Sequence, residues 1–135
     1  MTAVLSHHAR VEARPGLSYE ILVRGHRCTV DQPVASGGVD AGPTPTELFV
    51  AALASCVAFY AGQWLTRHGY PRTGLAVDAD FDMGERPTRV TEIRLRVHVP
   101  AEVPKEQWLG LHAVASHCTV SNTLMRPPVV TVTED

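Results

Sequence analysis

This chain of 135 residues has no excess of charge of either sign, and its formal net charge is -2. Its pI of about 6.4 agrees with that balance. Such a chain has no electrostatic field that would attract nucleic acid or an anionic membrane. Residues 1–10 lack the basic stretch and apolar core of a secretory signal. We therefore expect a cytoplasmic protein with no nucleic-acid and no membrane partner.

Motifs for metals, nucleotides and disulfide frameworks are also missing. The sequence has no C-x-x-C, no H-E-x-x-H, and no G-K-[ST] in its glycine-rich segment 36–43. We therefore expect neither a metal nor a cofactor. The three cysteines, Cys28, Cys56 and Cys118, are odd in number and widely spaced, which does not fit a disulfide framework. In a reducing cytosol such cysteines serve packing or catalysis.

Hydropathy patterns predict an α+β fold with a mostly antiparallel sheet, in one domain spanning residues 1–135. Apolar and charged residues alternate over 75–82 and 93–99, as in half-buried strands whose outer faces carry opposite charges. Other strand-forming segments, bounded by turn residues, are 10–13, 19–23, 27–30 and 129–133. Helices are expected over 46–68 and 104–117, and a short helical piece over 119–124.

The first of these helices has a well-marked start and an uncharged interior. Thr44 fits the N-cap, Pro45 the first turn and Glu47 the third position of a capping box. No charge occurs from Leu48 to Leu65. That length approaches a membrane span, but polar residues and a glycine interrupt it and no second span exists, so we interpret it as a buried helix. Because so short a chain can scarcely cover it, we expect a second subunit to do so in part.

The position of each cysteine indicates its environment. Cys56 lies in the middle of an alanine-rich helix, where a cysteine is by default a small buried hydrophobe. Cys118 lies at a polar helix end, a better place for a reactive thiol, and Cys28 lies in a strand. A reactive Cys56 would need a cation from elsewhere, since it is more than two turns from its helix N-terminus. The candidates, among which the sequence does not choose, are Arg14, Arg24 and Arg27.

Two segments resemble the OsmC/Ohr superfamily. Residues 37–56, Gly-Gly-Val-Asp-Ala-Gly-Pro-Thr-Pro-Thr-Glu-Leu-Phe-Val-Ala-Ala-Leu-Ala-Ser-Cys, are similar to its glycine-rich loop and first-cysteine helix. Residues 117–124, His-Cys-Thr-Val-Ser-Asn-Thr-Leu, are similar to its second-cysteine segment. The run from Gly25 to Pro33 fits the OsmC-like branch. The resemblance covers nearly the whole chain in the right order.

This resemblance implies an OsmC-like fold, an intertwined homodimer with two central helices, in which both subunits build each active site. It also implies a thiol-dependent peroxidase for organic hydroperoxides. Cys56 would form a sulfenic acid, Cys118 would resolve it to a disulfide, and an external dithiol, in the Ohr branch a lipoyl protein, would recycle the pair.

Arg14 is the counterpart of the catalytic arginine that the resemblance implies. The slot of the family's catalytic glutamate, directly after the helix-initial proline, holds Thr46. Glu47 follows one residue later, which is about 100° of helix rotation, so it is either catalytic or only a cap.

Two other functions fit the same residues. The first is a non-catalytic module that binds a small ligand, with a cleft lined by Phe49, Leu53, Phe59 and Tyr60. The second is a cysteine-nucleophile transferase or hydrolase, which needs a base beside Cys56 that the sequence does not identify.

Overall fold

The computed structural model describes residues 7–135, which fall into two units divided after Phe49. The long helix α1 (Pro45–Arg67) begins in the N-terminal unit and continues through the C-terminal one. Each unit is described by itself. The expectation of one domain over residues 1–135 stays a prediction.

The N-terminal unit contains an antiparallel sheet in the order β1-β2-β3. Its strands are β1 (Arg10–Ala13), β2 (Tyr19–Val23) and β3 (His26–Val30), followed by the 3₁₀ turn η1 (Val34–Ser36). Arg24 and Gly25, both with positive φ, form the two-residue turn between β2 and β3. Positive φ at both central residues is the geometry of hairpin turns that match the twist of the strands. The three strands predicted here are confirmed.

One carboxylate organises the glycine-rich loop that follows β3. Asp31 is only 1% exposed. It accepts backbone N–H groups from Gln32 (2.7 Å), Val39 (3.2 Å) and Ala41 (3.0 Å). These donors, Ala41 first, lower the pKa of Asp31 because they favour its charged form. A Cβ at Gly38 would lie 2.0 Å from the carbonyl oxygen of Gln32, so this close approach requires glycine.

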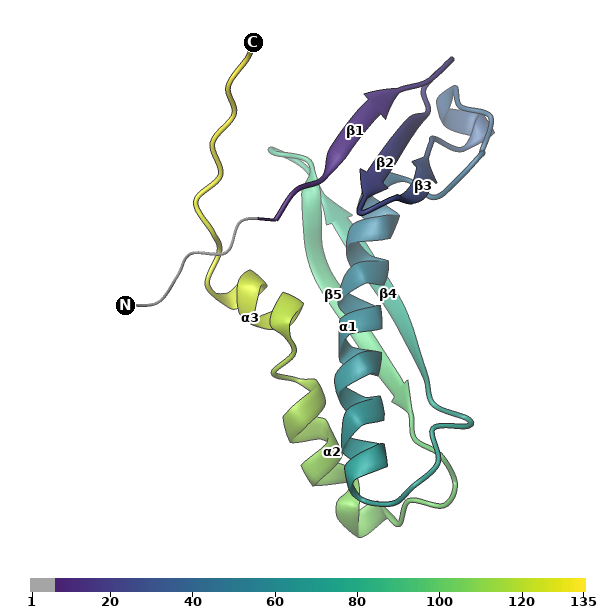
Figure 1. The fold of residues 1–135 in the computed structure, drawn as a ribbon, viewed down its shortest axis with the longest axis vertical. Helices are drawn as coiled ribbons and strands as arrows, with labels where there is room; N and C mark the ends of the chain where they lie inside the picture. The colour runs from purple at the N-terminus through teal and green to yellow at the C-terminus, as the bar shows by residue number, and fades with distance from the viewer. Residues whose placement is uncertain (1–6) are drawn as a thin grey trace. The chain divides into compact units, whose positions relative to one another are not determined.

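The C-terminal unit packs α1 against a long hairpin and two short helices (Figure 1). The hairpin pairs β4 (Ala76–Gly84) with β5 (Arg89–His98), and the 3₁₀ turn η2 (Lys105–Gln107), α2 (Trp108–Ala115) and α3 (Thr119–Met125) follow. On the outer face of the hairpin Arg94 binds Asp82 at 2.9 Å and His98 binds Asp78, as the alternating charges predict. The inner face carries the apolar partners of α1.

The core of the C-terminal unit lies between α1, α2 and β5. Ala61 and Leu65 of α1 are fully buried, and Gly110 of α2 faces the Trp64 ring, so that an added Cβ would meet it at 3.5 Å. Helix α1 is long and apolar enough to cross a membrane by length and composition alone. Its buried side chains form the centre of this core. The buried residues of the cluster are Leu53, Val57, Ala61, Trp64, Leu65, Val103, Leu111, Ala115 and Cys118.

At the C-terminal end one predicted helix is present with shorter bounds, and one predicted strand is wrong. The helix expected over 104–117 is shorter: η2 precedes α2, which ends at Ala115. The strand expected over 129–133 does not form, and its apolar side chains at Val129, Val130 and Val132 are 95%, 78% and 86% exposed. A strand needs a neighbour to satisfy its backbone groups, and within residues 7–135 no strand pairs with this segment.

Candidate thiol site

The helix that carries Cys56 starts as the sequence predicts. Thr44 Oγ1 accepts the Glu47 backbone N–H at 3.0 Å, and Glu47 Oε1 accepts the Thr44 backbone N–H at 2.9 Å. This reciprocal pair is the capping box, with Pro45 in the first turn. Glu47 therefore serves as a helix cap, and its catalytic role stays a prediction.

Cys118 lies at the start of α3 and has no exposed surface. It is the N-cap of α3, and its Sγ accepts the Ser121 backbone N–H at 3.4 Å. Burial is the main cause that raises the pKa of the Cys118 thiol, and the neighbouring Cys56 raises it further. The backbone N–H groups of Ser121 and Val120 act in the opposite direction. The net result favours the protonated thiol.

The structure brings Cys56 and Cys118 together across 62 positions of sequence. Cys56 is half-buried and packs against the cluster that contains Cys118. Both cysteines are free. Solvent therefore reaches the Cys56 side of the pair, while Cys118 lies behind it. Cys28 is exposed on β3 in the N-terminal unit.

A hydrogen bond beside the thiols joins the two elements that carry them. Tyr60 Oη and Thr119 Oγ1 are 2.8 Å apart. Tyr60 lies one helical turn after Cys56, and Thr119 directly follows Cys118. The sequence reasoning placed Tyr60 in a ligand cleft and missed this contact. The signal available in the sequence was the position of two hydroxyl side chains, Tyr60 one helical turn after Cys56 and Thr119 next to Cys118.

The arginines predicted to serve Cys56 belong to the N-terminal unit. Arg14 forms ion pairs with Glu12 and with Glu20, both at 3.4 Å. Arg27 also pairs with Glu20, and Arg24 occupies the β2–β3 turn. Arg14 is thus held by two carboxylates within its own sheet. Contact between any of these arginines and Cys56 stays a prediction.

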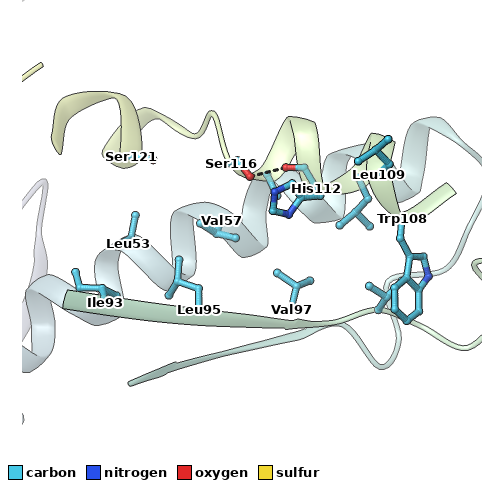
Figure 2. Close-up of a pocket in the computed structure, with 13 residues that line it drawn as sticks. Leu53, Val57, Ile93, Leu95, Val97, Trp108, Leu109, His112, Ser116 and Ser121 are labelled. Atoms are coloured by element: carbon cyan, nitrogen blue, oxygen red, sulfur yellow. Dashed lines mark hydrogen bonds between the residues drawn. The ribbon is translucent and has the colours of Figure 1, made fainter. Parts of the chain in front are cut away.

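An apolar cavity of about 670 Å³ lies between α1, β5 and α2 (Figure 2). This volume is in the usual range for small-molecule pockets. Its few polar side chains include His112 and Ser116, whose Oγ donates to the His112 carbonyl at 2.7 Å. Figure 2 shows the apolar side chains of α1 facing those of β5 across the cavity. The labelled apolar residues are Leu53, Val57, Ile93, Leu95, Val97, Trp108 and Leu109.

The cleft residues predicted for a binding module separate in the structure. Leu53 lines this cavity, Phe59 lines a smaller hollow on α1, and Tyr60 bonds to Thr119. Phe49 belongs to the N-terminal unit. Among residues 7–135, no group of three or more His, Cys, Asp or Glu side chains is arranged to hold a metal ion.

Comparison with known proteins identifies the family. The model of the OsmC-like protein family matches residues 37–133, well over half of the chain. A protein from Psychrobacter arcticus 273-4, named for osmotic stress induction and a detoxification response, has a TM-score of 0.80 at 19% identity over 91% of each chain. An OsmC-like protein of unknown function from Vibrio cholerae has a TM-score of 0.73 at 18% identity, over 89% of this chain and 94% of that one.

A third solved structure is an organic hydroperoxide resistance protein, OsmC, from Legionella pneumophila. Its TM-score is 0.62 at 14% identity over 91% of each chain. At these identities the likeness shows the fold alone. No curated protein shows significant sequence similarity to the chain. The family match confirms the resemblance carried by the two cysteine segments, and the chain belongs to the OsmC-like protein family.

Proposed function

We propose that this protein is a thiol-dependent peroxidase that reduces organic hydroperoxides through Cys56 and Cys118. The observation that carries the proposal is the adjacent pair of free thiols, one half-buried and one fully buried. Family membership and the Legionella relative, a protein named for organic hydroperoxide resistance, support a peroxide-related role in general.

The reaction has three balanced steps. The Cys56 thiolate attacks the distal oxygen of ROOH, the O–O bond breaks, and the alkoxide leaves and takes a proton as ROH. This leaves a sulfenic acid on Cys56. The Cys118 sulfur then attacks the sulfenic sulfur, which releases water and forms the Cys56–Cys118 disulfide. An external dithiol, such as a lipoyl group, supplies two electrons and two protons by exchange and becomes a disulfide itself.

The two environments suit these two roles. Burial holds Cys118 as a thiol, so it does not compete with Cys56 for the peroxide. When Cys118 gives up its proton in the second step, the backbone N–H groups of Val120 and Ser121 stabilise the resulting thiolate. Cys56 is the sulfur that solvent and substrate reach.

Activation of Cys56 requires a cation, because the thiolate is the reactive form. We propose Arg14 for this role. Glu47 either assists Arg14 in the active site or serves only as the helix cap. Replacing Arg14, Arg24 and Arg27 by glutamine, one at a time, tests the choice. The variant that slows the first oxidation of Cys56 identifies the cation, and equal rates in all three would refute an arginine in this role.

The assembly we propose is a cytoplasmic homodimer in which both subunits contribute to each active site. The exposed apolar side chains at Val129, Val130 and Val132 support it, because a second copy would cover them. Static light scattering of the protein, compared with a chain that ends at Pro128, measures the contribution of this segment.

The decisive experiment is a titration of the reduced protein with cumene hydroperoxide, followed by peptide mass spectrometry of the thiols. We expect a Cys56–Cys118 disulfide at about one equivalent per subunit, and turnover with a dithiol reductant that is lost in Cys56→Ser. Cys28→Ser is the matched control and should keep full turnover. Thiols that stay free, or turnover unchanged in Cys56→Ser, would refute the proposal.

The large cavity favours one alternative, a module that binds a small apolar ligand without catalysis. Its apolar lining and volume suit such a ligand. A ligand that co-purifies in stoichiometric amounts, together with both thiols inert to peroxide, would support this function instead of the peroxidase.

A further inference from the structure

A small hollow near the C-terminal end of α1 gathers two arginines beside an aromatic ring. Its volume is about 220 Å³, less than that of a pocket for a whole drug-sized ligand, so it suits one charged group and part of the molecule that carries it. It lies entirely within the C-terminal unit. The residues that line it are Phe59, Gly62, Gln63, Thr66, Arg67 and Arg72.

The two arginines of the hollow have no carboxylate partner. Among residues 7–135, neither Arg67 nor Arg72 forms an ion pair or a side-chain hydrogen bond, although five other arginines pair with acids. The sequence from residue 48 to residue 77 contains no Asp or Glu. The segment that builds the hollow is therefore positively charged, and its guanidinium donors are unused.

Gly62 leaves the room that Arg72 occupies. A Cβ at position 62 would lie 3.3 Å from Cδ of Arg72, so the stem of this arginine lies directly against α1. A cation in the last helical turn, such as Arg67, is favourable for the helix dipole alone. The dipole does not account for Arg72, which follows the helix and packs back onto it. Two like charges that line one small space repel each other, and an anion between them removes that repulsion.

The donors of the hollow fit a phosphate monoester better than a carboxylate. Such a phosphate carries a charge of about −1.5 to −2 at neutral pH and three strong acceptor oxygens, whereas a carboxylate carries one charge and two oxygens. Two guanidinium groups match the charge of the phosphate, and each can donate two parallel N–H groups to it. The Gln63 amide and the Thr66 hydroxyl add uncharged donors.

Phe59 gives the hollow an apolar wall. Its side chain is 59% exposed, so a second ring has room to pack on it. The hollow thus combines donors for a doubly charged group with a surface for a flat apolar one. A phosphate attached to a ring meets both requirements.

We propose that this hollow binds the phosphate group of a small phosphate monoester whose organic part is a ring that packs on Phe59. Arg67 and Arg72 hold the phosphate oxygens, and Gln63 and Thr66 donate to the same group. The inference is independent of the proposed peroxidase, because neither Cys56 nor Cys118 lines the hollow.

Calorimetry of the parent protein with three probes tests the ligand chemistry. Phenyl phosphate carries the phosphate and the ring, methyl phosphate lacks the ring, and phenylacetate carries the ring with a carboxylate. We expect phenyl phosphate to bind tightest, methyl phosphate about threefold more weakly, and phenylacetate about tenfold more weakly. Phenylacetate or methyl phosphate that binds as tightly as phenyl phosphate, or no binding of phenyl phosphate, would overturn the proposal.

Two double variants test the arginines. The test variant is Arg67→Gln/Arg72→Gln. The control is Arg86→Gln/Arg126→Gln, which removes the same charge from two exposed arginines that do not line the hollow. We expect the test variant to bind phenyl phosphate about tenfold more weakly, because charge-assisted hydrogen bonds are lost, and the control to bind it as the parent does. Equal weakening in both double variants would show a general attraction of anions and would overturn the proposal.

A single variant tests the ring. Phe59→Leu keeps an apolar side chain at this position and removes the ring face. It should weaken the binding of phenyl phosphate about threefold and leave that of methyl phosphate unchanged. Equal effects on the two phosphates would contradict packing of the ligand on Phe59.

NMR spectra of the parent locate the site without any variant. Phenyl phosphate should shift the backbone amide signals of residues 59–72, and added salt should reduce the shifts at a fixed ligand concentration. Shifts confined to other segments would overturn the proposal. Peroxide turnover is measured separately, so failure of the phosphate site and failure of the peroxidase are distinguishable.

Discussion

Replacing Tyr60 with phenylalanine should slow closure of the Cys56–Cys118 disulfide and leave the first oxidation of Cys56 unchanged. Tyr60 Oη and Thr119 Oγ1 form the one side-chain hydrogen bond between α1 and α3 among residues 7–135. It lies one turn after Cys56 and one residue after Cys118, so it joins the two elements that carry the thiols. The ring of Tyr60 remains in the variant, so packing against the core is kept.

The size of the effect follows from the strength of one hydrogen bond. A bond between neutral groups contributes about 0.5–1.5 kcal/mol net. At 1.4 kcal/mol per factor of ten, this corresponds to a decrease of about two- to tenfold in the population that is ready to close. Since Thr119 is exposed, the lower half of that range is expected.

The assay separates the two steps. Reduced protein is mixed with one equivalent of cumene hydroperoxide and quenched with an alkylating agent at set times. Loss of peroxide reports the sulfenic acid, and the cross-linked peptide reports the disulfide. Thr119→Val should act like Tyr60→Phe, and the double variant should be no slower than either, because both remove the same bond.

Tyr70→Phe is the matched control for the loss of a phenol hydroxyl. The Tyr70 ring stacks on Trp64 with centroids 6.2 Å apart, and its hydroxyl has no hydrogen-bond partner among residues 7–135. This variant should close the disulfide at the parental rate. The reasoning would be refuted if Tyr60→Phe closed the disulfide at the parental rate. It would also be refuted if the effects of Tyr60→Phe and Thr119→Val on the closure rate were additive in the double variant.

Three further predictions test the environments of single residues. Because burial raises the pKa of Cys118, alkylation of this thiol in the folded protein should begin only above the usual thiol pH range. The stability that the buried neutral thiol contributes should be lost as pH rises through the pKa of Cys118 in the folded protein. Exposed Cys28 is the internal reference, and equal alkylation rates of the two cysteines would contradict the burial of Cys118. Asp31→Asn removes acceptors from buried N–H groups and should lower Tm by on the order of 5–10 °C. Because the pKa of Asp31 is lowered, its contribution is present above the ordinary carboxyl pKa and lost in acid, so parent and variant should converge at low pH. Leu65→Ala, at a fully buried position, should cost about 2–5 kcal/mol in urea unfolding, and a loss below 1 kcal/mol would contradict the packing of α1.

The parts of the fold that the sequence predicted correctly are those set by neighbouring residues. The capping box needs only Thr44, Pro45 and Glu47, and the structure shows both of its hydrogen bonds. The charged face of the β4–β5 hairpin follows from alternation, and Arg94 and Asp82 pair across it. The segment 129–133 has an equally strong strand pattern, but a strand also needs a partner, which pattern alone does not supply.

The candidate site depends on contacts that no local pattern contains. Position alone predicted a packing role for Cys56, and only the family resemblance paired it with Cys118 across a hairpin and a helix. The bond from Tyr60 to Thr119 was missed for the same reason, since 59 residues separate them.

The roles that we propose for the two thiols rest on where each lies in its helix. A mid-helix cysteine can be half covered by a neighbouring element and still present one side to solvent, and Cys56 does so. An N-cap cysteine points its sulfur at backbone N–H groups, and once covered, it has donors ready for a charge that burial otherwise opposes. The first position favours attack on an incoming peroxide. The second favours a thiol that stays neutral until a sulfenic acid forms beside it. In the proposed mechanism, burial and backbone donors therefore set the order of the steps, because both groups are the same side chain.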